Sequence, residues 1–228
     1  MNTHYTYFYI LAAAFAGPFL LSFDKKVAFY KNWRFLFFAT LGPAVFYIAW
    51  DMYFTSKGVW GFNEKYITGI KLVNLPVEEV LFFFVVPYCC VFVYQCIRTY
   101  FPALQNRQPA KMILQVLAIF LLVMGLLCYN RYYTSWAFIF CGLFISAIYI
   151  FKYHFADFDA SSFLISFLII LVPFLVVNGF LTALPVVTYN DEENLGLRIY
   201  TIPFEDIFYG MLLVLMNVAF YERLRNRA

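Results

Sequence analysis

Two short segments of the chain combine a proline with neighbouring acidic residues, and they are its strongest candidates for chemistry. The segments are Leu75-Pro76-Val77-Glu78-Glu79 and Ile202-Pro203-Phe204-Glu205-Asp206. Each runs directly into an apolar stretch, so its carboxyl groups belong to the membrane end of a helix. Acids in that position are costly unless they face the interior of a bundle, where they usually serve a function. We therefore predict that Glu78, Glu79, Glu205 and Asp206 are catalytic.

Carboxyl groups crowded into a poorly solvated place cannot all be ionised. At least one should hold its proton at neutral pH and act as a general acid, while the others are candidate bases. Adjacent acids on a helix are about 100° apart, so one of each pair can face the centre while its neighbour orients it. Because Glu78 and Glu205 are the identical acids of the two segments, we expect them to carry the chemistry, with Glu79 and Asp206 orienting them. The alternative is two ordinary helix starts, since proline suits a first turn and acids face the positive end of the helix dipole.

Four further polar residues are expected on the same side of the membrane. Asp51 and Asn178 end two apolar runs, while Asn63 and Asn190 lie in the loops that follow. All four could orient the carboxyl groups by hydrogen bonding. For Asn63 and Asn190 a simple turn-forming role is an equal alternative.

The remaining polar and sulfur-bearing residues favour no metal and no cofactor. The cysteines lie in or beside apolar runs without metal-ligand spacing, which is typical of core residues; they are Cys89, Cys90, Cys96, Cys128 and Cys141. His4 and His154 are too few and too far apart for an iron or zinc cluster. No glycine-rich nucleotide motif occurs. The acidic run Asp191-Glu192-Glu193 is typical of a solvated loop.

The composition places these residues in a membrane. Hydrophobic residues make up 64% of the 228 residues and charged residues only 13%, and a soluble fold of this size could not hide so much apolar surface. The formal charge of +3 is small and scattered, which excludes nucleic-acid binding. Aromatic residues reach 23%, so the interior can line a pocket with ring faces that favour a cation.

Seven apolar stretches are long enough, or nearly so, to cross a bilayer as helices. We place them at about 4–22, 34–53, 76–97, 111–129, 134–151, 162–183 and 201–221. The loops after the first, third and fifth spans, with the tail, hold 11 Lys and Arg residues against 5 on the other side. The positive-inside rule therefore predicts an integral protein of the cell membrane, with its amino terminus outside and its carboxyl terminus in the cytoplasm.

The chain also matches itself at a shift of 127 residues without a gap. Among the aligned pairs are Asn63 with Asn190, Gly69 with Gly196, Pro76 with Pro203, and Glu78 with Glu205. This repeat predicts an all-α integral membrane fold of seven transmembrane helices, with two parallel three-helix repeats joined by a linker helix. The expected domains are 1–100 (first repeat), 101–130 (linker with the fourth transmembrane helix) and 131–228 (second repeat).

The chain resembles the membrane-integral lycopene β-cyclases that are built from two similar domains, here fused. The resemblance covers nearly the whole chain. It rests on Pro18–Asp24, Trp50-Asp51, Gly58–Asn63, Asn74–Glu79, Val177–Gly179, Pro185–Val187, Tyr189-Asn190, Glu193–Gly196 and Thr201–Asp206. Thr188 departs from the pattern, which has an aromatic residue there, and this departure bears on end-group or substrate preference.

The resemblance implies a cofactor-free isomerase that converts lycopene, taken sideways from the lipid, to γ-carotene and then β-carotene. An acid would protonate C2 of the terminal double bond, and the C5=C6 double bond would attack the resulting C1 cation. A base would then remove a proton from C6. The expected partners are lycopene, γ-carotene and membrane lipids.

A proton-coupled transporter is the alternative function, because transporters also combine parallel repeats with membrane acids. It predicts a polar route to both faces. A retinal-binding bundle is set aside, since the last span, 201–221, contains no Lys for a Schiff base.

Overall fold

Apolar runs form helices in lipid because a helix satisfies its own backbone hydrogen bonds. The computed structural model describes residues 3–227 and has seven α-helices among them. They are α1 (Thr6–Leu21), α2 (Trp33–Ser56), α3 (Val77–Tyr100), α4 (Gln108–Leu127), α5 (Tyr132–Ile150), α6 (Ala160–Ala183) and α7 (Asp206–Arg225). With the short 3-10 turns that precede α1 (η1, Thr3–Tyr5) and α2 (η2, Phe29–Asn32), all seven are long and apolar enough to cross a membrane. The predicted all-α membrane fold is confirmed.

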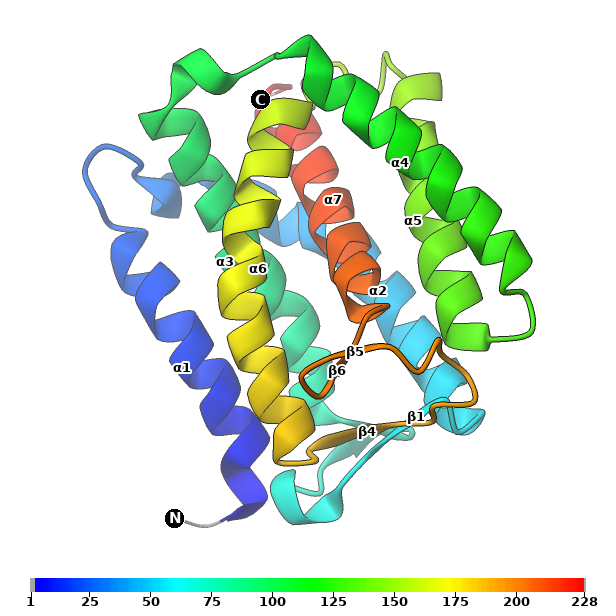
Figure 1. The fold of residues 1–228 in the computed structure, drawn as a ribbon. Coiled ribbons are helices and arrows are strands. Elements are labelled where there is room, and N and C mark those ends of the chain that lie inside the picture. Colours follow the sequence, from blue (N-terminus) through cyan, green and yellow to red (C-terminus); the bar gives the residue numbers. More distant parts are fainter. Residues whose placement is uncertain (1–2, 228) are drawn as a thin grey trace.

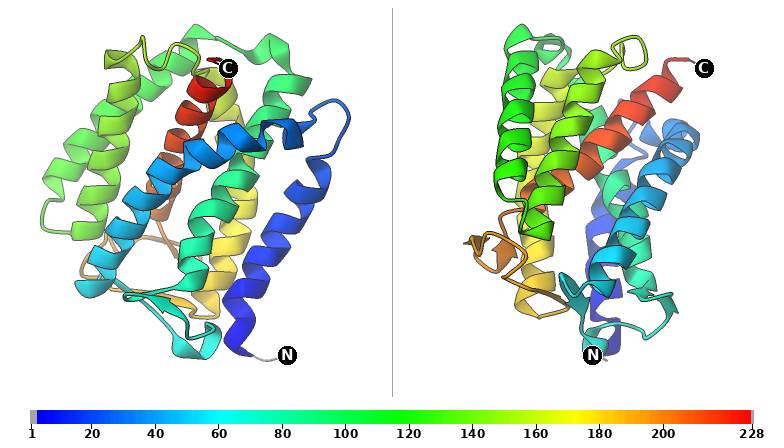
Figure 2. Two further views of the ribbon diagram at one scale, coloured as in Figure 1. Left: turned by 180° about the vertical axis from the view of Figure 1, so that it is seen from behind. Right: turned by 90° about the vertical axis from the view of Figure 1, so that its right-hand side faces the viewer.

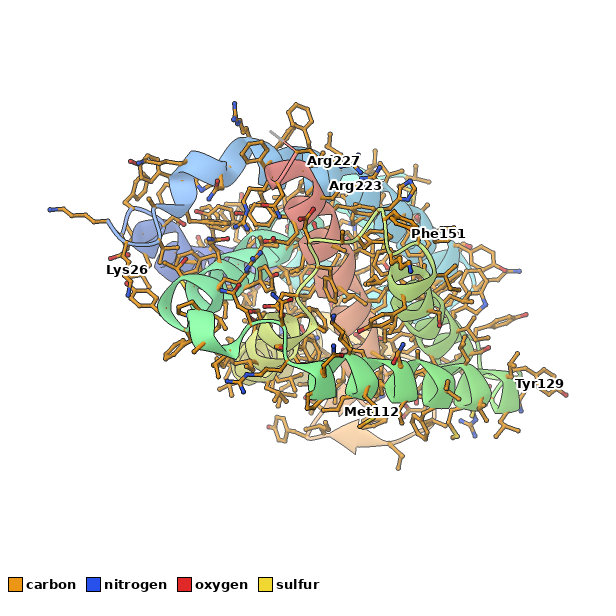
Figure 3. All side chains as sticks on the ribbon, turned by 90° about the horizontal axis from the view of Figure 1, so that it is seen from above. Lys26, Met112, Tyr129, Phe151, Arg223 and Arg227 are labelled. Carbon is orange, nitrogen blue, oxygen red and sulfur yellow. The ribbon has the colours of Figure 1, made fainter. Side chains whose placement is uncertain are left out.

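The helices run between two ends of the bundle that differ in their structural elements (Figure 1). The start of the chain and the labelled β-strands lie at one end, which we call the strand end. The carboxyl-terminal residues lie at the other, the C-terminal end, and the views from behind and from the side show the same separation (Figure 2). Seen from the C-terminal end, α4 forms an edge of the bundle, with Met112 on its outer side (Figure 3).

Three antiparallel pairs of short strands organise the strand end of the described chain. β1 (Trp60–Phe62) pairs with β4 (Val187–Tyr189), β2 (Lys71–Leu72) with β3 (Leu75–Pro76), and β5 (Arg198–Ile199) with β6 (Ile202–Pro203). Beside the β1–β4 pair, the Asn63 N–H donates to the Val186 carbonyl (3.0 Å) and the Asn190 N–H donates to the Val59 carbonyl (2.9 Å). Asn63 aligns with Asn190 and Val59 with Val186 at the 127-residue shift, so the two loops bind each other reciprocally.

The same shift relates the other elements. Adding 127 to the bounds of β1, β2, β3 and α2 gives the bounds of β4, β5, β6 and α6, while α1 and α3 correspond to α5 and α7 within two residues at each end. Packing follows this correspondence, because α1 packs on α3 as α5 packs on α7, and α2 packs on α7 as α6 packs on α3. α4 has no counterpart and returns the chain from the C-terminal end to the strand end, so that α5 can start in the direction of α1.

The two prolines of the acidic segments differ from the expectation that they begin helices. Pro76 and Pro203 both lie in two-residue strands, β3 and β6, immediately or shortly before a helix. Pro76 has φ −61° and ψ 147°, an extended conformation whose φ matches the value that the proline ring imposes. The last helix consequently starts at Asp206 rather than at residue 201.

Glycines allow α4 and α5 to approach closely. A Cβ atom on Gly142 of α5 would lie 3.0 Å from the Ala118 carbonyl oxygen of α4, and one on Gly125 of α4 would lie 3.2 Å from the Ile139 backbone nitrogen. Small residues at such crossings are a usual means of helix association in membranes. The linker helix α4 therefore packs closely against α5 of the second repeat through these small residues.

Candidate active site

Three carboxyl groups from three helices meet near the strand end of the bundle. Asp51 lies near the end of α2, Glu79 lies in the first turn of α3, and Asp206 begins α7. Their exposed fractions are 2%, 7% and 2%, and all three line one cavity of about 250 Å³. Buried acids need hydrogen-bonding partners, and each of the three has them.

The carboxyl groups of Asp51 and Glu79 lie close enough to interact directly. Tyr7 of α1 donates its hydroxyl to Glu79 Oε2 (2.7 Å), and Tyr209 of α7 donates to Asp51 Oδ1 (2.6 Å). An ionised carboxyl group accepts hydrogen bonds and cannot donate one. Two carboxyl groups this close can hydrogen-bond to each other only when one of them carries a proton.

Asp206 is surrounded by hydrogen-bond donors instead. Tyr133 of α5 donates to Oδ1, while Tyr189 of β4 (3.0 Å) and the Asn178 amide of α6 (3.2 Å) donate to Oδ2. Burial, followed by the charge of the Asp206 carboxylate, raises the pKa of Tyr189 well above its ordinary value. The Tyr189 hydroxyl thus keeps its proton and remains a donor. This arrangement of three donors fits a carboxylate.

The two halves of the cluster are equivalent in position but unequal in chemistry. Glu79 aligns with Asp206, and Asp51 aligns with Asn178, so each half pairs the carboxyl group of a helix start with a side chain near the end of the preceding long helix. In the first half the partner is an acid, and in the second it is an amide. A third donor, Tyr189, stands where the first half has Phe62.

Glu78 and Glu205 lie beside the cluster and outside the lining of the cavity. Both are fully buried. Glu78 Oε1 accepts the Thr68 N–H (2.7 Å), and Glu205 Oε1 accepts the equivalent Leu195 N–H (2.7 Å). Their Oε2 atoms have no partner among the described residues. These two glutamates tie each strand-end loop to the helix start that follows it.

The predicted supporting residues divide in the same way. Asn178 touches Asp206, whereas Asn63 Oδ1 accepts the Lys65 N–H (3.0 Å) and Asn190 Oδ1 accepts the Glu192 N–H (3.1 Å). The side chains of Asn63 and Asn190 thus make local turns, which was the alternative reading of the sequence, and their backbones join the two loops. Thr188, paired with Gly61 in the β1–β4 ladder, is exposed and lies outside the cavity lining.

Aromatic rings enclose the cavity around Asp206. Tyr133 and Tyr189 are stacked, with ring centroids 5.8 Å apart, and the Trp60 ring lies 5.1 Å from Tyr133 and 6.0 Å from Tyr209. All four residues line the cavity. Ring faces attract cations, most strongly in a site without water. The cluster can therefore shield a positive charge that develops near Asp206.

Away from the carboxyl groups the cavity is elongated and apolar. Glu79 and Val93 of α3 both line it, and the rise of fourteen residue steps along the helix from one to the other is roughly 21 Å. Its lining towards the C-terminal end includes Ala14, Pro18, Cys90, Val93, Phe167 and Ile170. These residues come from α1, α3 and α6. The shape suits a long hydrocarbon with one end at the carboxyl groups.

The tyrosine donors are the site residues that sequence reasoning missed. Tyr7, Tyr133, Tyr189 and Tyr209 are 4 of 19 tyrosines, and nothing in the spacing separates them from tyrosines that face lipid. Alignment of Tyr189 with Phe62 at the 127-residue shift was the available signal, because it marks a hydroxyl present in one half only.

Among residues 3–227, no group of three His, Cys, Asp or Glu side chains is arranged to hold a metal ion.

The fold and the site together define a seven-helix membrane protein with a carboxyl–tyrosine cluster at one end of an elongated apolar cavity. Comparison with known proteins identifies the family to which this fold and site belong. The family model described as lycopene cyclase matches residues 4–97 and 130–224, which is most of the chain in two segments. The chain belongs to the lycopene cyclase family, as the sequence resemblance indicated.

Two curated relatives, both named lycopene beta-cyclase, come from the R1 and NRC-1 strains of Halobacterium salinarum. Each is 39% identical over 82 residues, which is 34% of this chain and 34% of the relative. The chain thus spans about a third of the length of the curated relatives that it matches. No solved structure matches it significantly.

Proposed function

We propose that this protein is a lycopene β-cyclase, an isomerase that closes the ψ ends of lycopene to β rings without net oxidation or reduction. One carboxyl group delivers a proton to C2 of the terminal double bond. The C5=C6 double bond attacks the C1 cation, which closes the ring and moves the positive charge to C5. A carboxylate then takes the proton from C6, so the product has the mass of the substrate.

The observation that carries this proposal is a set of buried carboxyl groups at one end of an elongated apolar cavity. Proton transfer to carbon needs an acid and a base close together, in a pocket where water does not trap the cation. Asp51, Glu79 and Asp206 supply titratable groups at that end, and the rings around Tyr133 and Tyr209 supply the shielding. Family membership supports the same reaction.

The reacting carboxyl groups that we propose are Glu79 and Asp206, which reverses the division expected from sequence. Both line the cavity, and their neighbours Glu78 and Glu205 do not. Asp51, Asn178 and the tyrosines hold the reacting groups in place. Glu78 and Glu205 are positioning residues, because they accept hydrogen bonds from the loops that begin α3 and α7.

We infer that the substrate enters from the lipid between α1 and α6. Ala14 and Pro18 of α1 and Phe167, Ile170 and Phe174 of α6 line the cavity, and the two helices pack against each other. An apolar polyene needs no aqueous path, and its far end would extend towards the C-terminal end of the bundle. The partners are then lycopene and γ-carotene dissolved in the bilayer.

We further propose that the strand end faces the outside of the cell membrane and the C-terminal end faces the cytoplasm, in accordance with the distribution of Lys and Arg. The division into 1–100, 101–130 and 131–228 is part of this proposal. It is supported by the two matched segments, 4–97 and 130–224, and by the lack of a counterpart for α4.

The transporter alternative required a polar route to both faces. At the C-terminal end the buried Glu222 lies in ion pairs with Arg98 and Arg225, and none of these three lines the cavity. The lining between that cluster and Glu79 is apolar. The geometry therefore favours cyclisation.

Expression in a host that accumulates lycopene tests the function. We expect cyclic isomers of unchanged mass from the wild-type protein. Glu79→Gln and Asp206→Asn should each lower their yield by about 10²–10⁴-fold, as is usual for acid–base groups, at equal protein abundance. Glu64→Gln is the matched control, because the Glu64 side chain is 65% exposed. Unchanged lycopene with the wild-type protein would refute the proposal.

A further inference from the structure

We propose that the Asp51–Glu79 pair is the proton donor of the cyclisation and that the Asp206 carboxylate is the proton acceptor. The inference rests on the proposed function and deepens it, because it gives separate roles to the first half-site (Asp51 and Glu79) and the second half-site (Asn178 and Asp206). It follows from which groups donate and which accept around each carboxyl group.

The first half-site contains a proton that the second does not need. Asp51 and Glu79 lie close together in the cavity lining, and each accepts a hydrogen bond from a tyrosine hydroxyl, Asp51 from Tyr209 (2.6 Å) and Glu79 from Tyr7 (2.7 Å). Two neighbouring carboxyl groups that share one proton are a known way to keep an acid available near neutral pH. Glu79, which lines the cavity, delivers that proton to C2.

The second half-site is built for negative charge. All three hydrogen bonds to Asp206 come from Tyr133, Tyr189 and Asn178. An amide N–H and two phenol hydroxyls can be satisfied by a carboxylate without any proton on it. Asn178 stands where the first half-site has Asp51, so this replacement of an acid by an amide removes the shared proton from the second half-site.

The aromatic rings agree with this assignment. The stacked pair Tyr133 and Tyr189, with Trp60, lies on the Asp206 side of the cavity. After ring closure the positive charge is on C5, next to the C6–H bond that the base must break. The base and the cation-shielding rings should therefore lie together. They do so at Asp206.

The proton balance closes over one turnover. One proton leaves the Asp51–Glu79 pair and forms the C2–H bond, while the C6–H bond breaks and its proton reaches Asp206. The enzyme then returns to its starting state when Asp206 releases a proton and the pair regains one, with water at the strand end as donor and acceptor.

Product analysis distinguishes the two roles. Without its acid the enzyme cannot start, so Glu79→Gln and Asp51→Asn should lower all cyclic products by about 10²–10⁴-fold, with no change in their proportions. Without its base the C5 cation can still form, and it must lose a proton from C4 or from the C5 methyl group, or take up water. Asp206→Asn should therefore raise the share of ε-ring, exocyclic or hydroxylated products at least about tenfold while total turnover falls.

Infrared difference spectra of the purified wild-type protein against each variant give a readout independent of turnover. The wild-type-minus-variant spectra of Asp51→Asn and Glu79→Gln should show the band of a protonated carboxyl group. The corresponding spectrum of Asp206→Asn should lack this band. The assignment would be overturned if Glu79→Gln changed the proportions of the products, or if none of the three variants changed them. Loss of the protonated-carboxyl band in Asp206→Asn alone would also overturn it. A wild-type protein that forms no cyclic product would instead refute the proposed function.

Discussion

At the scale of single residues, hydroxyl and amide donors decide what each acid of the site can do. Glu79 and Asp206 are equivalent in the repeat, yet Glu79 lies beside a second acid, Asp51, and Asp206 is held by three hydrogen-bond donors, from Tyr133, Tyr189 and Asn178. Phe62, the equivalent of Tyr189, brings no hydroxyl to the first half-site. In the proposed assignment, these differences of one functional group between the two copies separate the acid from the base.

We predict that Tyr189→Phe weakens turnover without unfolding the protein. The change removes one of three donors to Asp206 and leaves the stacked ring in place. A hydrogen bond to a charged group contributes about 1.5–3 kcal/mol, so kcat/KM should fall roughly 10–100-fold. Tyr200→Phe is the control, because Tyr200 is 82% exposed. Steady-state kinetics with lycopene in detergent or vesicles would measure the effect, and equal activity of both variants would contradict the role given to Tyr189.

At the scale of helices and strands, part of the architecture could be predicted from sequence and part could not. Seven apolar runs and a gapless repeat fix the number and order of the helices, because lipid leaves the backbone few alternatives. The sequence could not predict which acid of each pair faces the cavity. Glu78 and Glu79 differ by about 100° around the helix axis, and tertiary packing sets the rotation of the helix about that axis. The extended conformation at Pro203 likewise depends on pairing with β5.

For Glu78 and Glu205 we predict an effect on stability rather than on chemistry. Gln at either position keeps an acceptor oxygen for the Thr68 or Leu195 N–H but adds a buried amide group without an acceptor. An unsatisfied buried group costs about 1–3 kcal/mol, so the melting temperature and membrane abundance should fall, while turnover per folded molecule falls less than for Glu79→Gln. Thermal melts combined with activity per folded protein test this, and a variant that is stable but inactive would restore the role expected from sequence.

The contact between α4 and α5 gives a second prediction at this scale. Gly142→Ala puts a methyl group 3.0 Å from the Ala118 carbonyl oxygen, and overpacking of this kind costs about 1–3 kcal/mol. Gly17→Ala places its methyl group in open space on α1 and is the matched control. Melting temperatures should fall for Gly142→Ala alone, and equal values would show that the linker helix is not held by this crossing.

At the scale of the whole molecule, the carboxyl groups lie at one end of the bundle and the cavity extends towards the other. In the proposed cyclisation, one end of the polyene therefore reacts per binding event, and formation of a second ring would require the half-cyclised product to rebind in reverse. The reciprocal loop contacts through Asn63 and Asn190 place the cluster beside the junction of the two repeats. A fused pair of repeats thus forms one site rather than two.

We predict that the strand end is external. Reporters after Arg107 and at the carboxyl terminus should read as cytoplasmic, and one in the Asp191–Asn194 loop should read as external, because the basic residues gather at the C-terminal end. The two reporter positions at that end control for each other. A cytoplasmic reading for the Asp191–Asn194 loop would contradict the proposed orientation.

The most direct measurement is conversion of lycopene by the purified protein in deuterated buffer, without flavin or nicotinamide. Each ring that closes by protonation at C2 and loss of the C6 proton should carry one added deuterium, so monocyclic and bicyclic products should gain one and two. We expect this labelling from the wild type and from Glu64→Gln, and a loss of about 10²–10⁴-fold in product with Glu79→Gln. Unlabelled rings, or full labelled turnover by Glu79→Gln, would contradict acid–base cyclisation at this site.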